Sequence, residues 1–241
     1  MPKVIAVLGA GTGLGVSVAR RFGREGFRVA LVARRRERLD ALVEQLEADG
    51  IEAAGFPADL SRPADVPALL ARIRERFGRI DVIEYGPVST ELSLTPATRT
   101  DAALLEKGLP LFLLTPVEVV RAVLPEWIDR GEGAFLMTTG VTAVRPTPGL
   151  SGMAPLGAAA RNYLHALHGE LAGSGIYAGT LSVGAGIARS ELSALAAQSG
   201  SAQSSAESAP EFPVVDPDDL AEQYWEMYTR RDRVEQLYPQ A

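Results

Sequence analysis

The sequence of 241 residues contains no cysteine and only two histidines. Without cysteine the protein has no disulfide, no thiolate metal site and no thiol nucleophile. The histidines, His165 and His168, are spaced to share one helix face, but no third ligand is evident and we expect no metal site. No apolar run reaches the ~18 residues that a membrane span needs, so we expect no membrane segment and a cytoplasmic protein.

An excess of positive charge is also absent. The formal net charge of −6 argues against a general nucleic-acid surface, so we expect a small-molecule ligand and no nucleic acid. Aromatic residues make up 6% of the chain against 46% hydrophobic residues overall, which indicates a globular core built mainly from Ala, Leu and Val. This length and composition predict one domain over residues 1–241.

Apolar runs suited to strands alternate with amphipathic runs suited to helices. The expected strands are Val4–Leu8, Arg28–Val32, Ile51–Phe56, Ile80–Glu84, Ala134–Thr138 and Gly179–Val183. Longer helices are expected over Leu111–Arg130, where Pro116 bends or delays the start, and over Pro155–Gly173. The alternation predicts βαβ units and therefore an α/β fold, a doubly wound parallel sheet with helices on both faces.

A segment late in the chain breaks this pattern. Residues 198–210 are rich in Ser, Ala, Gln and Gly and can bury little surface, so we expect a mobile segment over about 190–214. Order resumes with Asp216 or Asp218, either of which suits the start of a last helix that runs to about Tyr228.

A glycine-rich turn follows the first strand directly. Gly9, Gly13 and Gly15 let the chain turn tightly, admit a phosphate close to the backbone and pack the next helix against the strand. The N–H groups and the dipole of that helix then face the phosphate. The turn predicts a nucleotide site.

The spacing of these glycines resembles the short-chain dehydrogenase/reductase family, and the resemblance extends to about residue 190. Residues 79–83 and 131–139 look like the fourth and fifth strands of that family's Rossmann fold. The resemblance implies a nicotinamide cofactor, a substrate side near residues 190–214, and a homodimer or homotetramer assembled through helices 111–130 and 155–173. It also implies cofactor contacts at Thr12, Leu14, Asp59, Leu60, Gly86, Gly186, Ile187 and Ser190.

The residues after the second strand favour NADP(H). An NAD-preferring protein places an acid there on the ribose hydroxyls, whereas this chain has Ala33 followed by Arg34 and Arg35. Guanidinium groups bind a 2′-phosphate bidentately. The alternative is a solvated basic start to a helix, and Asp59 likewise has the alternative of a residue before a helix cap.

The family's catalytic tetrad is missing. Its asparagine, serine, tyrosine and lysine fall on Phe112, Gly140, Met153 and Gly157. The only lysines, Lys3 and Lys107, have no tyrosine four residues before them, so no realignment restores the Tyr-xxx-Lys pair.

Three residues are weak catalytic candidates, and each has a structural alternative. Thr139 could hydrogen-bond a carbonyl or simply end a strand, and Tyr85 could be a buried anchor. Glu84 could be an acid with a raised pKa or a paired structural carboxylate. The sequence thus indicates an NADP(H)-dependent oxidoreductase with an atypical active site, acting on a small carbonyl, enone or quinone compound. A catalytically silent subunit, or a non-redox cyclase, isomerase or lyase in the same pocket, stays open.

Overall fold

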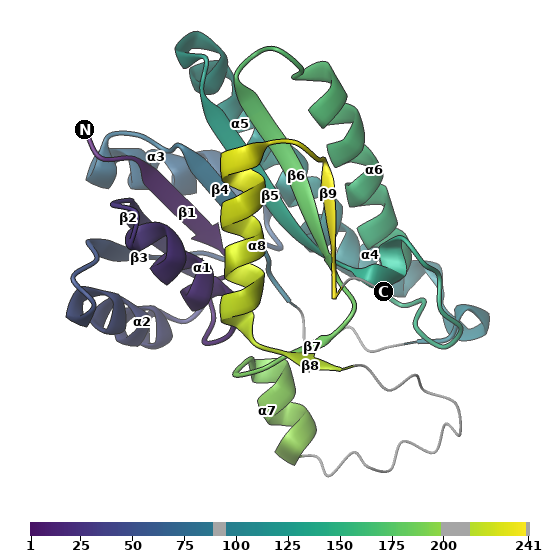
Figure 1. Cartoon of the computed structure of the whole chain (residues 1–241). Coiled ribbons are helices and arrows are strands. Elements are labelled where there is room, and N and C mark those ends of the chain that lie inside the picture. The colour runs from purple at the N-terminus through teal and green to yellow at the C-terminus, as the bar shows by residue number, and fades with distance from the viewer. Residues whose placement is uncertain (89–94, 199–212, 240–241) are drawn as a thin grey trace.

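The computed structural model describes residues 1–88, 95–198 and 213–239. Its centre is a seven-stranded sheet in the order β3-β2-β1-β4-β5-β6-β9, in which every neighbouring pair is parallel (Figure 1). The strands are β1 (Val4–Leu8), β2 (Arg28–Ala33), β3 (Ala53–Pro57), β4 (Val82–Tyr85), β5 (Gly133–Gly140), β6 (Ile176–Val183) and β9 (Glu235–Tyr238). A separate pair, β7 (Gly186–Ile187) and β8 (Val214–Val215), lies beyond the carboxyl ends of the central strands.

Helices cover both faces of the sheet. One face packs on α1, α2 and α8, and the other on α3, α5 and α6, so the predicted doubly wound α/β architecture is confirmed. The helices are α1 (Leu14–Gly23), α2 (Arg36–Ala48), α3 (Val66–Phe77), α4 (Ala102–Leu109), α5 (Thr115–Arg130), α6 (Ala154–Glu170), α7 (Glu191–Gln198) and α8 (Pro217–Arg230).

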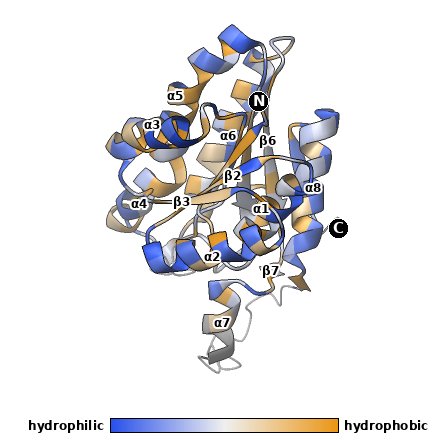
Figure 2. Cartoon of the chain, turned by 90° about the vertical axis from the view of Figure 1, so that its left-hand side faces the viewer, coloured by the Kyte–Doolittle hydropathy of each residue, from blue (hydrophilic) through white to orange (hydrophobic). Residues whose placement is uncertain are grey.

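Burial on both faces explains why the strands read as apolar runs. Every residue of β1 is 0% exposed, and β2 is buried from Val29 to Val32. A parallel sheet covered by two helical layers has no solvent face, so polar residues do not alternate along its strands. Figure 2 shows the complementary pattern outside, where the outward side of α2 is hydrophilic.

The structure adds strands that the apolar pattern does not predict. β9 has the sequence Glu-Gln-Leu-Tyr, which is too polar and too short to read as a core strand, and it pairs with β6 at the sheet edge. β6 itself begins at Ile176 rather than Gly179, because it pairs with β5 along its whole length. Pro116 does not delay the start of its helix, because helical structure begins earlier: a π-helical turn, Pro110–Leu114, joins α4 to α5, and Pro116 lies in the first turn of α5.

The segment Ala102–Arg130 is nearly continuous helix. By length and composition alone it could cross a membrane, a test that core helices also pass. Here its second half packs on the sheet through Val119, Val123 and Trp127, each at most 1% exposed. Those contacts account for the apolar residues of this half that face the sheet, whereas the apolar window of the whole helical stretch is 33% buried.

The expectation of a mobile segment over about 190–214 falls mainly on residues 199–212, which lie outside the described residues. The preceding part forms α7. After the segment, Asp216 caps α8 as expected, because its carboxylate accepts a hydrogen bond of 2.8 Å from the backbone N–H of Asp218.

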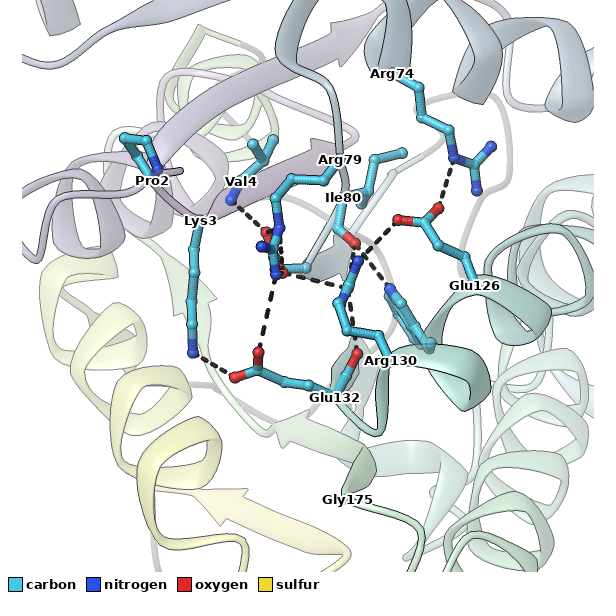
Figure 3. Close-up of polar contacts among 12 residues, drawn as sticks. Pro2, Lys3, Val4, Arg74, Arg79, Ile80, Glu126, Arg130, Glu132 and Gly175 are labelled. Carbon is cyan, nitrogen blue, oxygen red and sulfur yellow. Dashed lines mark hydrogen bonds and ion pairs between the residues drawn. The ribbon is translucent and has the colours of Figure 1, made fainter.

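A charged cluster holds the amino ends of the central strands together (Figure 3). The Asp81 side chain is 1% exposed and accepts hydrogen bonds from Arg79 and from the backbone N–H of Val4, the latter at 2.8 Å. Arg130 lies 3.2 Å from the same carboxylate and donates to the carbonyl of Ile80. The cluster joins β1, β4 and α5 at the edge opposite the glycine turn.

Candidate nucleotide-binding and active site

The turn between β1 and α1 forms what we call the phosphate cradle, residues 9–15 with the first turn of α1. Its N–H groups at Gly9 and Ala10 both donate to the carbonyl of Val32, each at 2.9 Å, which fixes the turn to the end of β2. Within the described residues no side chain caps α1, and its first turn holds no acidic residue. No side chain of the described residues therefore competes with an anion for the free N–H groups of this helix N-terminus.

Close backbone contacts require glycine in this turn. Gly9 has φ +104°, and a Cβ there would lie 2.5 Å from the backbone nitrogen of Pro87. A Cβ on Gly15 would lie 2.8 Å from the Cα of Ala10. Any side chain would push β1, α1 and the exit of β4 apart, so these glycines have a packing role as well as a role in admitting a ligand.

An arginine cluster, Arg34, Arg35, Arg36 and Arg38, follows β2 at the same edge, and all four side chains are exposed. Arg34 makes no ion pair within the described residues, whereas Arg35 donates to the carboxylate of Glu191 at 2.8 and 3.0 Å. Arg34 and Asp59 lie near each other. Burial opposes ionisation of Asp59, but hydrogen bonds from Ser61 and the charges of Arg34 and Arg62 outweigh it and hold the pKa of the carboxyl below its usual range.

Of the other residues expected to contact the cofactor, most lie at the carboxyl edge of the sheet and one lies in the core. Gly86 bonds through its N–H to the carbonyl of Leu8 at 3.0 Å and touches Gly9. Gly186 and Ile187 form β7, held by β8. Leu60 instead packs its side chain in the core and is 6% exposed. The Thr12 hydroxyl donates to the carbonyl of Arg189 at 2.7 Å, and the next residue, Ser190, lies against Gly13 of the phosphate cradle.

The four positions at which the resemblance places the family's tetrad lie together and offer no titratable side chain. Phe112 is in the π-helical turn, Gly140 ends β5, Met153 precedes α6 and Gly157 is in its first turn. α6 packs against both the π-helical turn and the turn after β5, which gathers the four positions. None of the four side chains at these positions can donate or accept a proton.

Tyr85 and Thr139 are both engaged in the protein interior. Tyr85 is 0% exposed, and its hydroxyl donates to the carbonyl of Leu111 at 2.5 Å. The Thr139 hydroxyl lies 2.7 Å from Ser182 Oγ, which in turn donates to Glu235 at 2.7 Å. Arg161 pairs with Glu235 at 2.5 Å and completes this Thr139 network. Both side chains therefore have structural contacts that account for their polarity.

Glu84 is the candidate with unusual chemistry. Its carboxyl is 1% exposed and shares a hydrogen bond of 3.1 Å with Thr138, whose hydroxyl lies 2.7 Å from that of Tyr224 on α8. A Cβ on Gly86 would lie 2.6 Å from Glu84 Oε1, so the carboxyl sits directly against the turn after β4. Burial raises the pKa of Glu84 to about 8, against the opposing hydrogen bond from Thr138, and the group is mostly protonated at pH 7.

Sequence reasoning missed the partners of these residues. Tyr224 reads as one more apolar position of a helix, and Glu235 as part of a polar tail. The residue pairs Thr138 and Tyr224, and Ser182 and Glu235, are 86 and 53 residues apart. Of these residues, only Glu84 stands out in the sequence, as a lone acid in an apolar strand.

A parallel sheet wound with helices on both faces, with a glycine turn after its first strand, defines a Rossmann-type nucleotide-binding fold. The family model described as short chain dehydrogenase matches residues 3–196. The chain belongs to the short-chain dehydrogenase/reductase family. A short chain dehydrogenase of Pseudocercospora fijiensis is 29% identical over 192 residues, which cover 80% of this chain and 62% of that protein.

Solved structures of the family share the fold. An actinorhodin polyketide ketoreductase variant with NADPH superposes with a TM-score of 0.84 at 22% identity, covering 98% of this chain and 95% of that one. A short chain oxidoreductase from Pseudomonas aeruginosa PAO1, described as containing an atypical catalytic center, gives a TM-score of 0.82 at 18% identity, with 98% and 94% covered.

The raised pKa of Glu84 predicts a pH-dependent stability. The unfolded carboxyl ionises near 4.5, whereas the folded one keeps its proton until about pH 8. The free energy of unfolding should therefore fall as the pH rises from about 4.5 to 8, by on the order of 3–5 kcal/mol from this group. Glu84→Gln removes this component, and urea unfolding at pH 5, 6.5 and 8 measures it.

The exposed Glu44→Gln variant on α2 is the matched control and should follow the unmodified protein at each pH. If Glu84→Gln also follows the unmodified protein at every pH, the buried carboxyl does not titrate in this range.

Proposed function

We propose that this protein is an NADP(H)-dependent oxidoreductase with an atypical active site. The observation that carries the proposal is the arrangement at the carboxyl edge of the sheet. There an uncapped helix N-terminus lies beside an exposed arginine cluster, with no acid where an NAD-binding protein places one. The polyketide ketoreductase structure with NADPH supports this assignment.

These residues fit a dinucleotide carrying a 2′-phosphate. The N–H groups of the phosphate cradle would hold the pyrophosphate, and Arg34 with Arg35 would hold the 2′-phosphate through charge-assisted hydrogen bonds. Gly86, Gly186, Ile187 and Ser190 would line the nicotinamide half, with Asp59 at the adenine. The bound cofactor supplies hydride transfer; the protein supplies orientation and exclusion of water.

The lack of a proton donor at these positions restricts which compounds can accept a hydride from the cofactor. Reduction of a simple ketone develops an alkoxide, which needs a positioned acid, and Phe112, Gly140, Met153 and Gly157 provide none. Quinones and conjugated enones instead give a delocalised anion that water protonates. Glu84 holds a proton at neutral pH, but it lies buried behind Gly86. We therefore propose quinones or enones as the substrate class.

The cofactor assignment predicts a strong preference for NADPH over NADH in calorimetric titration. Arg34→Ala should weaken NADPH binding by about 10-fold or more and change NADH binding little, because a guanidinium–phosphate contact contributes roughly 1.5–3 kcal/mol. Arg24→Ala, an exposed arginine at the far end of α1, is the control and should alter neither affinity. Equal affinities for the two cofactors would refute the assignment.

The substrate class predicts that NADPH is oxidised by quinones or enones and not measurably by simple ketones. Met153→Tyr with Gly157→Lys should create weak ketone reduction. A side chain at Gly157 fits, since its Cβ would lie 3.4 Å from that of Ala143, an ordinary contact. NADPH consumption over a panel of acceptors is the measurement. Binding of NADPH without consumption by any acceptor would contradict the proposal and favour a catalytically silent subunit.

We also propose that the protein is a homodimer or homotetramer. An apolar groove of about 330 Å³ runs between α5 and α6, lined by Val117, Leu124 and Tyr163 among others, and Leu114 and Ile128 on the same helical stretch are 41% and 56% exposed. Val120, Leu164 and Leu167 on the same two helices are buried within the chain. Light scattering at micromolar concentration should give a multiple of 25.6 kDa. A species of one chain would be the contrary result.

A further inference from the structure

The chain segment at the start of α7 lies directly on the phosphate cradle. A Cβ on Gly13 would lie 3.1 Å from the Cα of Ser190, and the Thr12 hydroxyl donates to the carbonyl of Arg189 at 2.7 Å. The backbone of residues 189–190 therefore contacts the turn that the proposed function assigns to the pyrophosphate.

The position of this segment is fixed from its other side. Arg189 has a left-handed conformation with φ +59°, which turns the chain sharply before α7. Its guanidinium pairs with Asp216 at 2.6 Å and with Asp218 at 3.0 Å, both at the start of α8. Ser190 then accepts a hydrogen bond of 3.1 Å from the N–H of Ser193 and begins α7. These contacts place Glu191 opposite α2.

The Glu191 carboxylate meets the arginine cluster. Both of its oxygens accept hydrogen bonds from Arg35, at 2.8 and 3.0 Å, and Arg38 contacts it as well. A carboxylate and a phosphate present similar oxygen acceptors to a guanidinium group, so Glu191 uses the same donors that a 2′-phosphate would use. The two anions repel each other and compete for one set of positive charges.

We propose that Glu191 is a cofactor-specificity residue that competes with the 2′-phosphate for Arg35. The proposal rests on the proposed NADP(H) function and deepens it. A ligand with a 2′-phosphate must displace the Glu191 carboxylate, which releases the start of α7 from α2. A ligand without that phosphate leaves the contact in place. The competition lowers the affinity for 2′-phosphorylated ligands and couples their binding to the substrate-side helix.

The test compares two minimal probes, 2′,5′-ADP and 5′-AMP, which differ only in the 2′-phosphate. Glu191→Gln should bind 2′,5′-ADP about 3- to 10-fold more tightly than the unmodified protein, as expected for loss of an exposed competing charge, and should bind 5′-AMP equally. Glu37→Gln is the matched control. Glu37 is exposed beside the same arginines and makes no ion pair in the part of the chain that the structure describes, so removal of its charge should give a smaller change.

Two further measurements separate competition from a general charge effect. In an Arg35→Ala background, Glu191→Gln should lose most of its gain. Addition of 2′,5′-ADP, but not of 5′-AMP, should increase hydrogen exchange at residues 191–198. An affinity for 2′,5′-ADP that is unchanged, weakened, or raised no more than by Glu37→Gln would overturn the role of Glu191. Absence of any preference for 2′,5′-ADP over 5′-AMP in the unmodified protein would instead refute the proposed NADP(H) function.

Discussion

The buried carboxylate of Asp81 sets the register on which the site depends. Through its side chain and backbone it binds Val4 at the start of β1, and its carbonyl accepts from Ala134 in β5 at 3.0 Å. Parallel strands aligned at one end bring their carboxyl ends out together, so Gly9, Gly86 and Thr138 reach the same edge. The buried Asp81 carboxylate is stabilised by ion pairs with Arg79 and Arg130.

At that edge β5 directs two adjacent hydroxyls to opposite layers. Thr138 reaches Glu84 and α8, whereas Thr139 reaches Ser182, Glu235 and the α6 side. Each hydroxyl is used by buried polar neighbours, which leaves the exposed end of the strand to Gly140. The carboxyl of Glu84 and the hydroxyls of Thr139 and Ser182 therefore lie in the interior, beneath the exposed end of β5.

The sequence predicts those features of the structure that are set by residues close together along the chain. The glycine turn, the arginines after β2 and the layered α/β sheet all follow from short patterns, and the fold agrees with them. The contact of Glu191 with Arg35 could not be predicted from local patterns, because the two residues are 156 residues apart in the sequence. β9 was missed for a related reason: its pairing with β6 supplies the stability that its own polar sequence does not. Distant pairings follow from the folded topology and not from local propensity.

The place of Glu235 near the end of the described chain also bears on the order of assembly. Ser182 and Arg161 are synthesised well before it, and until β9 docks on β6 they have no carboxylate to bind. Contacts between segments far apart in the sequence cost more loop-closure entropy than local contacts. During synthesis on the ribosome, Ser182 and Arg161 therefore lack this carboxylate until β9 emerges and pairs with β6.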